Sequence, residues 1–172
     1  MRFVGTAYRA HNPRWSFRPT SGDGAAIHGG RFNPKGMPAL YLSVGVITAI
    51  KEANQAFAHK MEPYVLCSYE IDCEDIANLG DDAARNAAGV EESVLSAAWF
   101  AHVAAGTTPP QWTMVIDLVA RGSAGALVPS YAPGAMASER NLVLWKWGPD
   151  LPHKISVHDP SGRLPKNQLS WD

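Results

Sequence analysis

One short stretch of the chain holds side chains that could do chemistry together. It runs Gly29-Gly30-Arg31-Phe32-Asn33-Pro34-Lys35-Gly36 and continues into an apolar run that contains Tyr41 and Ser43. The paired glycines allow positive φ angles and a close approach of the backbone to a ligand, so the turn is expected to present Arg31. Asn33 to Gly36 is a second turn signal, because proline presets φ and glycine can take the left-handed conformation.

A carboxylate follows this stretch on a predicted helix. Residues 38–43 are typical of a short buried strand, and a helical pattern begins just after it. The apolar positions of that pattern are Val46, Ile47, Ile50, Ala53 and Phe57. Glu52 falls near the edge of this apolar stripe, so its carboxylate is expected to face a cleft covered by the strand.

These side chains suit a nucleotide with a cleavable glycosidic bond. Arg31 and the upstream Arg9 could bind a pyrophosphate, because guanidinium groups match phosphate oxygens bidentately and stay charged. Tyr41 offers a flat face for a heteroaromatic ring. Glu52 could accept a ribose hydroxyl and stabilise the positive charge that develops as the bond breaks. NAD+, a dinucleotide with a nicotinamide leaving group, satisfies all of these requirements.

Other chemistries fit the sequence less well. The six histidines show no metal-binding spacing, so no metal site is expected, although His28 beside the glycine turn could touch a ligand. Ser130 lacks the Gly-x-Ser-x-Gly turn of a serine hydrolase. No complete dinucleotide-binding fingerprint is present, so NAD+ would be a consumed substrate and not a redox cofactor. Each candidate also has a structural alternative, such as an arginine ion pair, a core tyrosine or a solvated helical glutamate.

The composition and periodicity indicate one α+β domain. The chain has 172 residues, of which 46% are hydrophobic and 18% are charged, and this suits a single core. Residues 10–29 show no periodicity and predict a long ordered loop or a mobile flap. We expect one domain over residues 1–172, with a core at about 8–158 and a tail at 159–172. Strands are predicted at 3–8, 38–43, 64–72, 126–128, 141–147 and 154–158, and helices at 46–57, 81–88, 91–105 and 111–121.

Charge, cysteine content and apolar runs limit the partners and the cellular location that the sequence allows. A formal net charge of -1 gives no electrostatic case for direct binding to nucleic acid. Cys67 and Cys73 are too few for a disulfide scaffold and lack the spacing of a zinc site. The N-terminus has no signal-like apolar region, and no run approaches the roughly 20 apolar residues that span a bilayer. The sequence therefore predicts a soluble cytoplasmic protein without a membrane segment.

Four segments of the chain, in order, resemble the RES family of bacterial toxins. The core of the resemblance is Gly-Gly-Arg-aromatic-Asn-Pro-x-Gly, then Leu-Tyr-Leu-Ser, then the helix that carries Glu52. Upstream, Tyr8-Arg9 resembles the family's early aromatic-arginine pair. Downstream, Leu127 to Ser130 and Asn141 to Leu144 resemble its late Val-Pro-Ser and Asn-Leu segments. The matches span about residues 8–144, and several segments in the family's order are a more specific signal than a lone Gly-Gly-Arg.

The resemblance implies a fold, an activity and a set of roles. RES proteins are similar in fold to ADP-ribosyltransferase toxins, with short twisted strands and flanking helices, and they cleave the nicotinamide–ribose bond of NAD+. By this resemblance Arg9 and Arg31 would hold the diphosphate and the nicotinamide riboside, and Glu52 would be the catalytic carboxylate. Ser130 would order the pocket, with Ser43 as the alternative family serine. The other residues expected to bind NAD+ are Tyr41, Gly30, Asn33 and His28.

The resemblance also implies a partner and leaves the acceptor of ADP-ribose open. A RES toxin is paired with an Xre-like antitoxin that blocks the active site and carries the DNA-binding function. Transfer to a protein would make the chain a mono-ADP-ribosyltransferase, whereas transfer to water or phosphate would make it a glycohydrolase or a phosphorylase that depletes NAD+. The oligomeric state stays open, with a homodimer inside the toxin–antitoxin complex as one alternative. A non-catalytic module that binds NAD+, ADP-ribose or a partner on the same scaffold is the alternative function.

Overall fold

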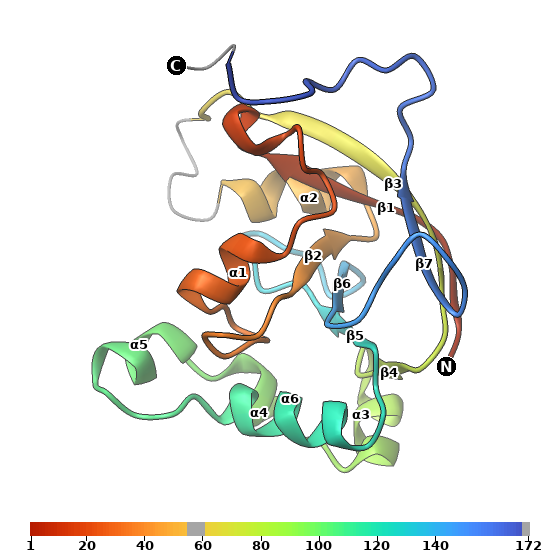
Figure 1. Ribbon diagram of the computed structural model, residues 1–172. Coiled ribbons are helices and arrows are strands. Elements are labelled where there is room, and N and C mark those ends of the chain that lie inside the picture. Colours follow the sequence, from red (N-terminus) through yellow and green to blue (C-terminus); the bar gives the residue numbers. More distant parts are fainter. Residues whose placement is uncertain (55–60, 170–172) are drawn as a thin grey trace.

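A seven-stranded mixed sheet organises the chain (Figure 1). The computed structural model describes residues 1–54 and 61–169. The strand order is β4-β5-β6-β2-β1-β3-β7, and every neighbouring pair is antiparallel except the parallel pair β4 and β5. The strands are β1 (Phe3–His11), β2 (Leu40–Ser43), β3 (Val65–Cys73), β4 (Ile76–Asn78), β5 (Gly125–Pro129), β6 (Arg140–Leu144) and β7 (His153–Val157).

Short helices flank this sheet. In Figure 1, α3 to α6 gather at the lower end of the sheet, whereas α2 lies beside β1 and β2. Within the described ranges, no helix has the length and apolar character needed to cross a membrane. The helices are the 3-10 helix η1 (Pro13–Trp15), α1 (Asp23–His28), α2 (Val46–Ala53), α3 (Asp82–Ala88), α4 (Glu92–Ser96), α5 (Trp99–Ala104) and α6 (Pro110–Ala120).

Strands β2 and β6 separate two apolar clusters because their side chains alternate between the two faces of the sheet. Leu40 and Leu42 of β2 join the buried cluster shared with β1, β3 and β7. Val143 of β6 belongs to the second buried cluster, which is formed with α4 and α6. The same alternation turns Tyr41 and Ser43 away from the first cluster. Burial on both faces fixes the register of these two strands, so their polar residues have fixed positions.

The segment predicted as a long loop is partly regular structure. Strand β1 continues to His11, which pairs with Val65 of β3, and α1 occupies the end of the segment. The prediction of an unbroken loop over residues 10–29 was therefore wrong. The segment is held by the hydroxyl of Tyr69, which donates to the Pro19 carbonyl at 2.8 Å. It is also held by the indole of Trp147, which donates to the Thr20 carbonyl at 3.0 Å.

The single helix predicted over residues 91–105 is broken into α4 and α5. Arg31 donates to the carbonyls of Leu95 and Ala97 at 3.1 and 2.9 Å, and the Gln111 amide donates to the same two carbonyls. A carbonyl at a helix end needs such a partner, and here tertiary contacts supply it. The composition of residues 91–105 predicts a continuous helix, because the side chains that bind these carbonyls, Arg31 and Gln111, lie outside that segment.

Other predicted boundaries shifted as well. Strand β4 was not predicted, since three residues give too short a pattern. Strand β6 ends at Leu144, three residues before the end of the strand predicted over residues 141–147. Cys67 and Cys73 are free and buried on β3.

Helix α2 presents a different face to the sheet than its apolar pattern predicts. Thr48 and Ala49 are buried, whereas Val46 and Ile47 are 37% and 61% exposed. The predicted stripe was therefore wrong for these residues, and Phe57 lies outside the described residues. Small side chains at the contact let α2 approach β1 and β2 closely. Glu52 follows Thr48 and Ala49 by four and three positions, so it shares their inward face.

The buried pair of His11 and Tyr69 predicts a pH-dependent stability. Because the Tyr69 hydroxyl donates to Pro19, it accepts its hydrogen bond from Nε2 of a neutral His11. Burial, assisted by the charge of Arg9, lowers the pKa of His11 from 6.5 to about 4. The unfolded chain therefore binds a proton first as pH falls, and stability present above pH 6.5 is lost towards pH 4. The full loss is on the order of 3 kcal/mol.

Thermal melting at a series of pH values between 7 and 4 tests this prediction. The control is His11→Gln, which keeps a donor for Tyr69 but does not titrate. The melting temperature of the parent should fall more steeply than that of His11→Gln as pH drops. Parallel curves for the two proteins would contradict the assignment of a neutral, buried His11.

Candidate active site

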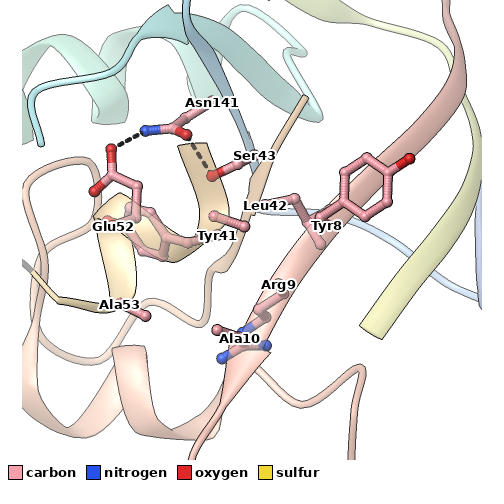
Figure 2. Close-up of a pocket in the computed structure, with 10 residues that line it drawn as sticks. Tyr8, Arg9, Ala10, Tyr41, Leu42, Ser43, Glu52, Ala53 and Asn141 are labelled. Carbon is pink, nitrogen blue, oxygen red and sulfur yellow. Dashed lines mark hydrogen bonds between the residues drawn. The ribbon is translucent and has the colours of Figure 1, made fainter. Parts of the chain in front are cut away.

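A cavity opens where strands β1 and β2 separate. The two strands pair through Tyr8 and Ser43 alone. Continuing the antiparallel register would place Arg9 opposite Leu42 and Ala10 opposite Tyr41. All four of these residues instead line a cavity of about 290 Å³, shown in Figure 2. The split in the sheet therefore leaves two strand edges open to a ligand at the centre of the molecule.

Glu52 of α2 reaches into this cavity and is held there by hydrogen bonds. Its Oε1 accepts from the Ser130 hydroxyl at 2.6 Å and from the Asn141 amide at 2.5 Å. The Ser43 hydroxyl donates to Oδ1 of Asn141 at 2.8 Å, and Figure 2 shows the contacts that run from Ser43 through Asn141 to Glu52. The donation from Ser43 fixes the orientation of the amide and points its nitrogen at the carboxylate. Two residues that lie 78 and 89 positions away in the sequence thus set the position of one carboxylate.

A second, smaller cavity shares a wall with the first. It has a volume of about 140 Å³ and shares Tyr41, Glu52 and Asn141 with the larger cavity. The remaining lining residues are mostly aromatic, with one cation: Arg31, Phe32, Trp99, Tyr131 and Val143. Glu52 therefore stands between an aromatic compartment and a compartment that ends at Arg9.

Arg31 is fixed at the edge of the aromatic cavity. Besides its bonds to the carbonyls in the α4–α5 break, its guanidinium carbon lies 4.6 Å from the centre of the Tyr131 ring, a cation–π arrangement. Burial lowers the pKa of Arg31, and the charge of Glu52 is among the influences that oppose this shift. The arginine predicted to project from the glycine turn thus lies beside Glu52, with its donors partly used by the backbone.

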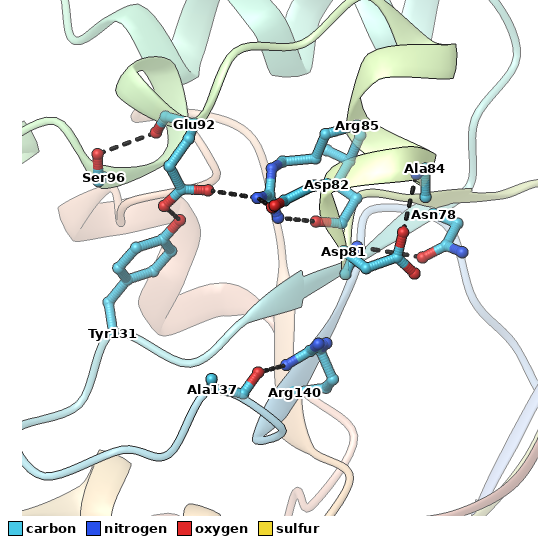
Figure 3. A network of polar contacts seen from close by, with 12 residues as sticks. Asn78, Asp81, Asp82, Ala84, Arg85, Glu92, Ser96, Tyr131, Ala137 and Arg140 are labelled. Carbon is cyan, nitrogen blue, oxygen red and sulfur yellow. Dashed lines mark hydrogen bonds and ion pairs between the residues drawn. The ribbon is translucent and has the colours of Figure 1, made fainter.

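A polar network binds the hydroxyl group of Tyr131 (Figure 3). Its hydroxyl donates to Glu92 at 3.0 Å, and Glu92 forms an ion pair with the buried Arg85 at 3.1 Å. Arg85 also pairs with Asp82 and donates to a backbone carbonyl. This network orients the ring that packs against Arg31, because a tyrosine with a fixed hydroxyl has little rotational freedom.

Arg9 forms the far end of the larger cavity. Its guanidinium donates to the Ser21 carbonyl at 3.1 Å, and burial lowers its pKa. Within the described residues, neither Arg9 nor Arg31 forms an ion pair with a carboxylate. Burying a cation is costly without a counter-charge, and an anionic ligand would supply one. The two arginines are therefore suited to a substrate that carries phosphate.

Gly30, Asn33 and Tyr41 form one packed unit at the turn. The Tyr41 hydroxyl donates to Asn33 at 2.7 Å and accepts from the Phe32 backbone N–H at 3.0 Å. The buried amide of Asn33 donates to the carbonyls of Ala25 and Met37. Neither Gly30 nor Asn33 lines either cavity, so both act through the position of Tyr41. Burial raises the pKa of Tyr41, which keeps its hydroxyl neutral.

Two tryptophans clamp the backbone of the same turn. The indole of Trp112 on α6 donates to the Gly30 carbonyl, and that of Trp145 donates to the Phe32 carbonyl, both at 2.8 Å. Arg31 lies between these two anchored residues. The turn is therefore held by α6 and by the residue that follows β6, and its arginine keeps a fixed direction.

The predicted site residues fall into four groups. Arg9, Arg31, Tyr41, Ser43 and Glu52 line the two cavities. Ser130 lies outside these linings but touches Glu52 directly. Gly30 and Asn33 support the turn from behind, and His28 is an exposed residue of a different cavity that also includes Arg9. Of the two candidate serines, Ser130 contacts the carboxylate and Ser43 acts through Asn141.

Sequence reasoning missed Asn141, Trp99 and Tyr131 as residues of the site. Asn141 lies in the Asn-Leu segment, and a polar residue that begins a strand of alternating apolar positions is a usable signal. Trp99 falls within the helix predicted over residues 91–105, where no pattern marks it as a site residue, and nothing local distinguishes Tyr131 from a surface loop residue. These two residues reach the site only through the fold of the chain between β4 and β6.

Comparisons with known proteins agree with this architecture. The model of the RES domain family matches residues 6–167. The chain is similar to a chain in the crystal structure of the M. tuberculosis MbcT–MbcA toxin–antitoxin complex, with 23% sequence identity and a TM-score of 0.64. That match covers 92% of this chain and 84% of the other, and at this identity it shows the fold. No curated protein matches the chain.

The packing at Gly30 predicts a steric effect of a single methyl group. A Cβ at Gly30 would lie 2.5 Å from the Tyr41 hydroxyl and 2.7 Å from Oδ1 of Asn33. Gly30→Ala should therefore lower the free energy of unfolding by about 1–3 kcal/mol, measured by urea denaturation. The matched control is Gly24→Ala on α1, where an added Cβ meets nothing within 4 Å. Equal stability of the two variants would contradict the tight packing described here.

Proposed function

The chain belongs to the RES domain family, and on that premise we propose that it is the toxin of a toxin–antitoxin pair and cleaves the nicotinamide–ribose bond of NAD+. One observation carries the proposal. The Glu52 carboxylate, bound by Ser130 and Asn141, stands between two cavities that each hold an arginine without a described carboxylate partner. A dinucleotide with a central diphosphate and a cationic leaving group suits that arrangement.

The two cavities suit different parts of NAD+. We assign nicotinamide to the smaller cavity, where Tyr41, Trp99 and Tyr131 offer aromatic faces for stacking. The ribose and the diphosphate would then occupy the larger cavity, with Arg9 as the phosphate ligand. Because Glu52 lines both cavities, this placement brings the bond between nicotinamide and ribose to its carboxylate.

The charges near Glu52 suit cleavage of that bond. When it breaks, its electron pair moves to the ring nitrogen and nicotinamide leaves as a neutral molecule. The ribose carbon gains oxocarbenium character, which the Glu52 carboxylate stabilises. The positive charge of Arg31 disfavours the pyridinium cation of the substrate more than the neutral product. Ser130 and Asn141 hold the carboxylate in position throughout, so no reorganisation is needed as charge develops.

The acceptor and the partner complete the proposal. A nucleophile then attacks the ribose carbon, and water, phosphate or a protein side chain would serve. Cytoplasmic NAD+ would be the substrate, and an Xre-like antitoxin would block the cleft. The similar solved structure is itself a toxin–antitoxin complex, which supports an antitoxin partner. We assign the activity to one domain spanning residues 1–172.

Glu52→Gln provides the direct test of this proposal. The amide keeps an oxygen that can accept from Ser130 and Asn141, so the fold and melting temperature should be preserved. The loss of negative charge should lower kcat for NAD+ cleavage about 100-fold or more, measured by release of nicotinamide. The matched control is Glu74→Gln, an exposed residue in the turn between β3 and β4, which should keep parental activity.

Two outcomes of that experiment would contradict the proposal. Full activity in Glu52→Gln would remove the carboxylate from the reaction. Binding of NAD+ or ADP-ribose to the parent protein without any turnover, measured by calorimetry, would favour the non-catalytic module instead.

Labelled NAD+ added to the protein in a cell lysate identifies the acceptor. With the label on the ADP-ribose half, transfer to a protein gives a labelled protein band. Glycohydrolysis or phosphorolysis gives labelled ADP-ribose or its phosphate and no band. Either result supports cleavage, and each should be absent with Glu52→Gln. Label that stays in intact NAD+ with the parent protein would contradict the proposed activity.

A further inference from the structure

A third cavity lies on the other side of Arg9. It has a volume of about 380 Å³ and is formed by the end of β1, by η1 and by α1. This segment was predicted as a loop, and its ordered structure creates the cavity. Neither the proposed chemistry at Glu52 nor the packing of the core uses this space.

The walls of this cavity carry large apolar side chains that the core leaves uncovered. Trp15 is 56% exposed and Ile27 is 67% exposed, yet both line the same hollow. Ser21 and Asp23 add polar groups, and Asp23 forms a salt bridge with Arg18 at 2.9 Å. A concave apolar surface with a few polar groups is typical of a site for a small molecule.

The three cavities adjoin one another in a row. Arg9 and Ala10 line both the third cavity and the larger of the two already described. Tyr41, Glu52 and Asn141 line both that cavity and the aromatic one. The row therefore runs from an aromatic compartment, past a carboxylate and a guanidinium, to an apolar compartment. The guanidinium at the second junction marks where a bridging phosphate would lie.

We infer that the third cavity receives the adenosine half of the dinucleotide, with the adenine ring between Trp15 and Ile27. This inference rests on the proposed function, because it assigns the end of the substrate that the chemistry at Glu52 does not touch. Stacking on an aromatic ring tolerates any base and is strong enough to govern affinity. Adenosine binding beyond Arg9 places the diphosphate beside that guanidinium.

A side chain that fills the cavity tests the assignment without touching the catalytic residues. Gly24 lies on α1 at the cavity wall, its φ angle is not positive, and an added Cβ meets nothing within 4 Å. Gly24→Leu adds a large side chain at this wall and is expected to narrow the space assigned to adenosine. The matched control is Gly148→Leu, at a glycine with the same steric freedom outside the lining of the three cavities.

A comparison of two substrates distinguishes an effect on adenosine binding from an effect on bond cleavage. NAD+ and nicotinamide mononucleotide contain the same nicotinamide–ribose bond, and only NAD+ has the adenosine half. Gly24→Leu should raise KM for NAD+ about tenfold, equivalent to roughly 1.4 kcal/mol, with kcat unchanged. Its kcat/KM for nicotinamide mononucleotide should match that of the parent. Gly148→Leu should match the parent with both substrates.

A second variant and a binding measurement make the test independent of turnover. Trp15→Ala removes the stacking face, and because Trp15 is exposed the fold should persist. Calorimetry with AMP should show binding to the parent and to Gly148→Leu, and at least tenfold weaker binding to Gly24→Leu and Trp15→Ala.

The outcomes distinguish this inference from the proposed function. AMP binding that both cavity variants weaken would support the adenosine site even if the parent protein did not cleave NAD+. Parental KM for NAD+ in both cavity variants, together with AMP binding that they leave unchanged, would overturn the inference while leaving the proposed activity intact.

Discussion

The structure depends on the separation of β1 from β2 immediately after their single paired position, Tyr8 with Ser43. An antiparallel pair that continued would fill the centre of the sheet with backbone hydrogen bonds and leave no cavity. The strands can part because each has another partner, β3 for β1 and β6 for β2. The open edges then face α2, which packs on both strands through Thr48 and Ala49 and brings Glu52 into the gap.

The two arginines of the site are each held by backbone carbonyls from another segment of the chain. Arg31 is anchored by carbonyls in the break between α4 and α5, and Arg9 by a carbonyl in the segment before α1. The break exists because those carbonyls find partners outside the helix, so site geometry and helix geometry stabilise each other. Half-buried cations held by neutral dipoles keep their charge available to a ligand, which suits a substrate with phosphate.

The sequence predicted the structure correctly where a local pattern of residues is compatible with one kind of element. The glycine turn, the strand after it and the helix that carries Glu52 were all predicted, because turn residues and periodicity act over a few positions. The apolar pattern of α2 nevertheless indicated the wrong inward face. Periodicity shows that a helix is amphipathic, but close packing against two strands favoured the small residues Thr48 and Ala49 and left Val46 and Ile47 exposed.

By itself, the sequence determined the family resemblance, the α+β class and the residue types at the centre: two arginines, a tyrosine and a glutamate. Only the tertiary structure decided that Asn141 and Ser130 bind the glutamate, that Tyr131 packs on Arg31, and that three cavities meet along one row. The physical reason is distance along the chain. Glu52 and Asn141 are 89 positions apart, and such a contact depends on strand order and register, which no local pattern encodes.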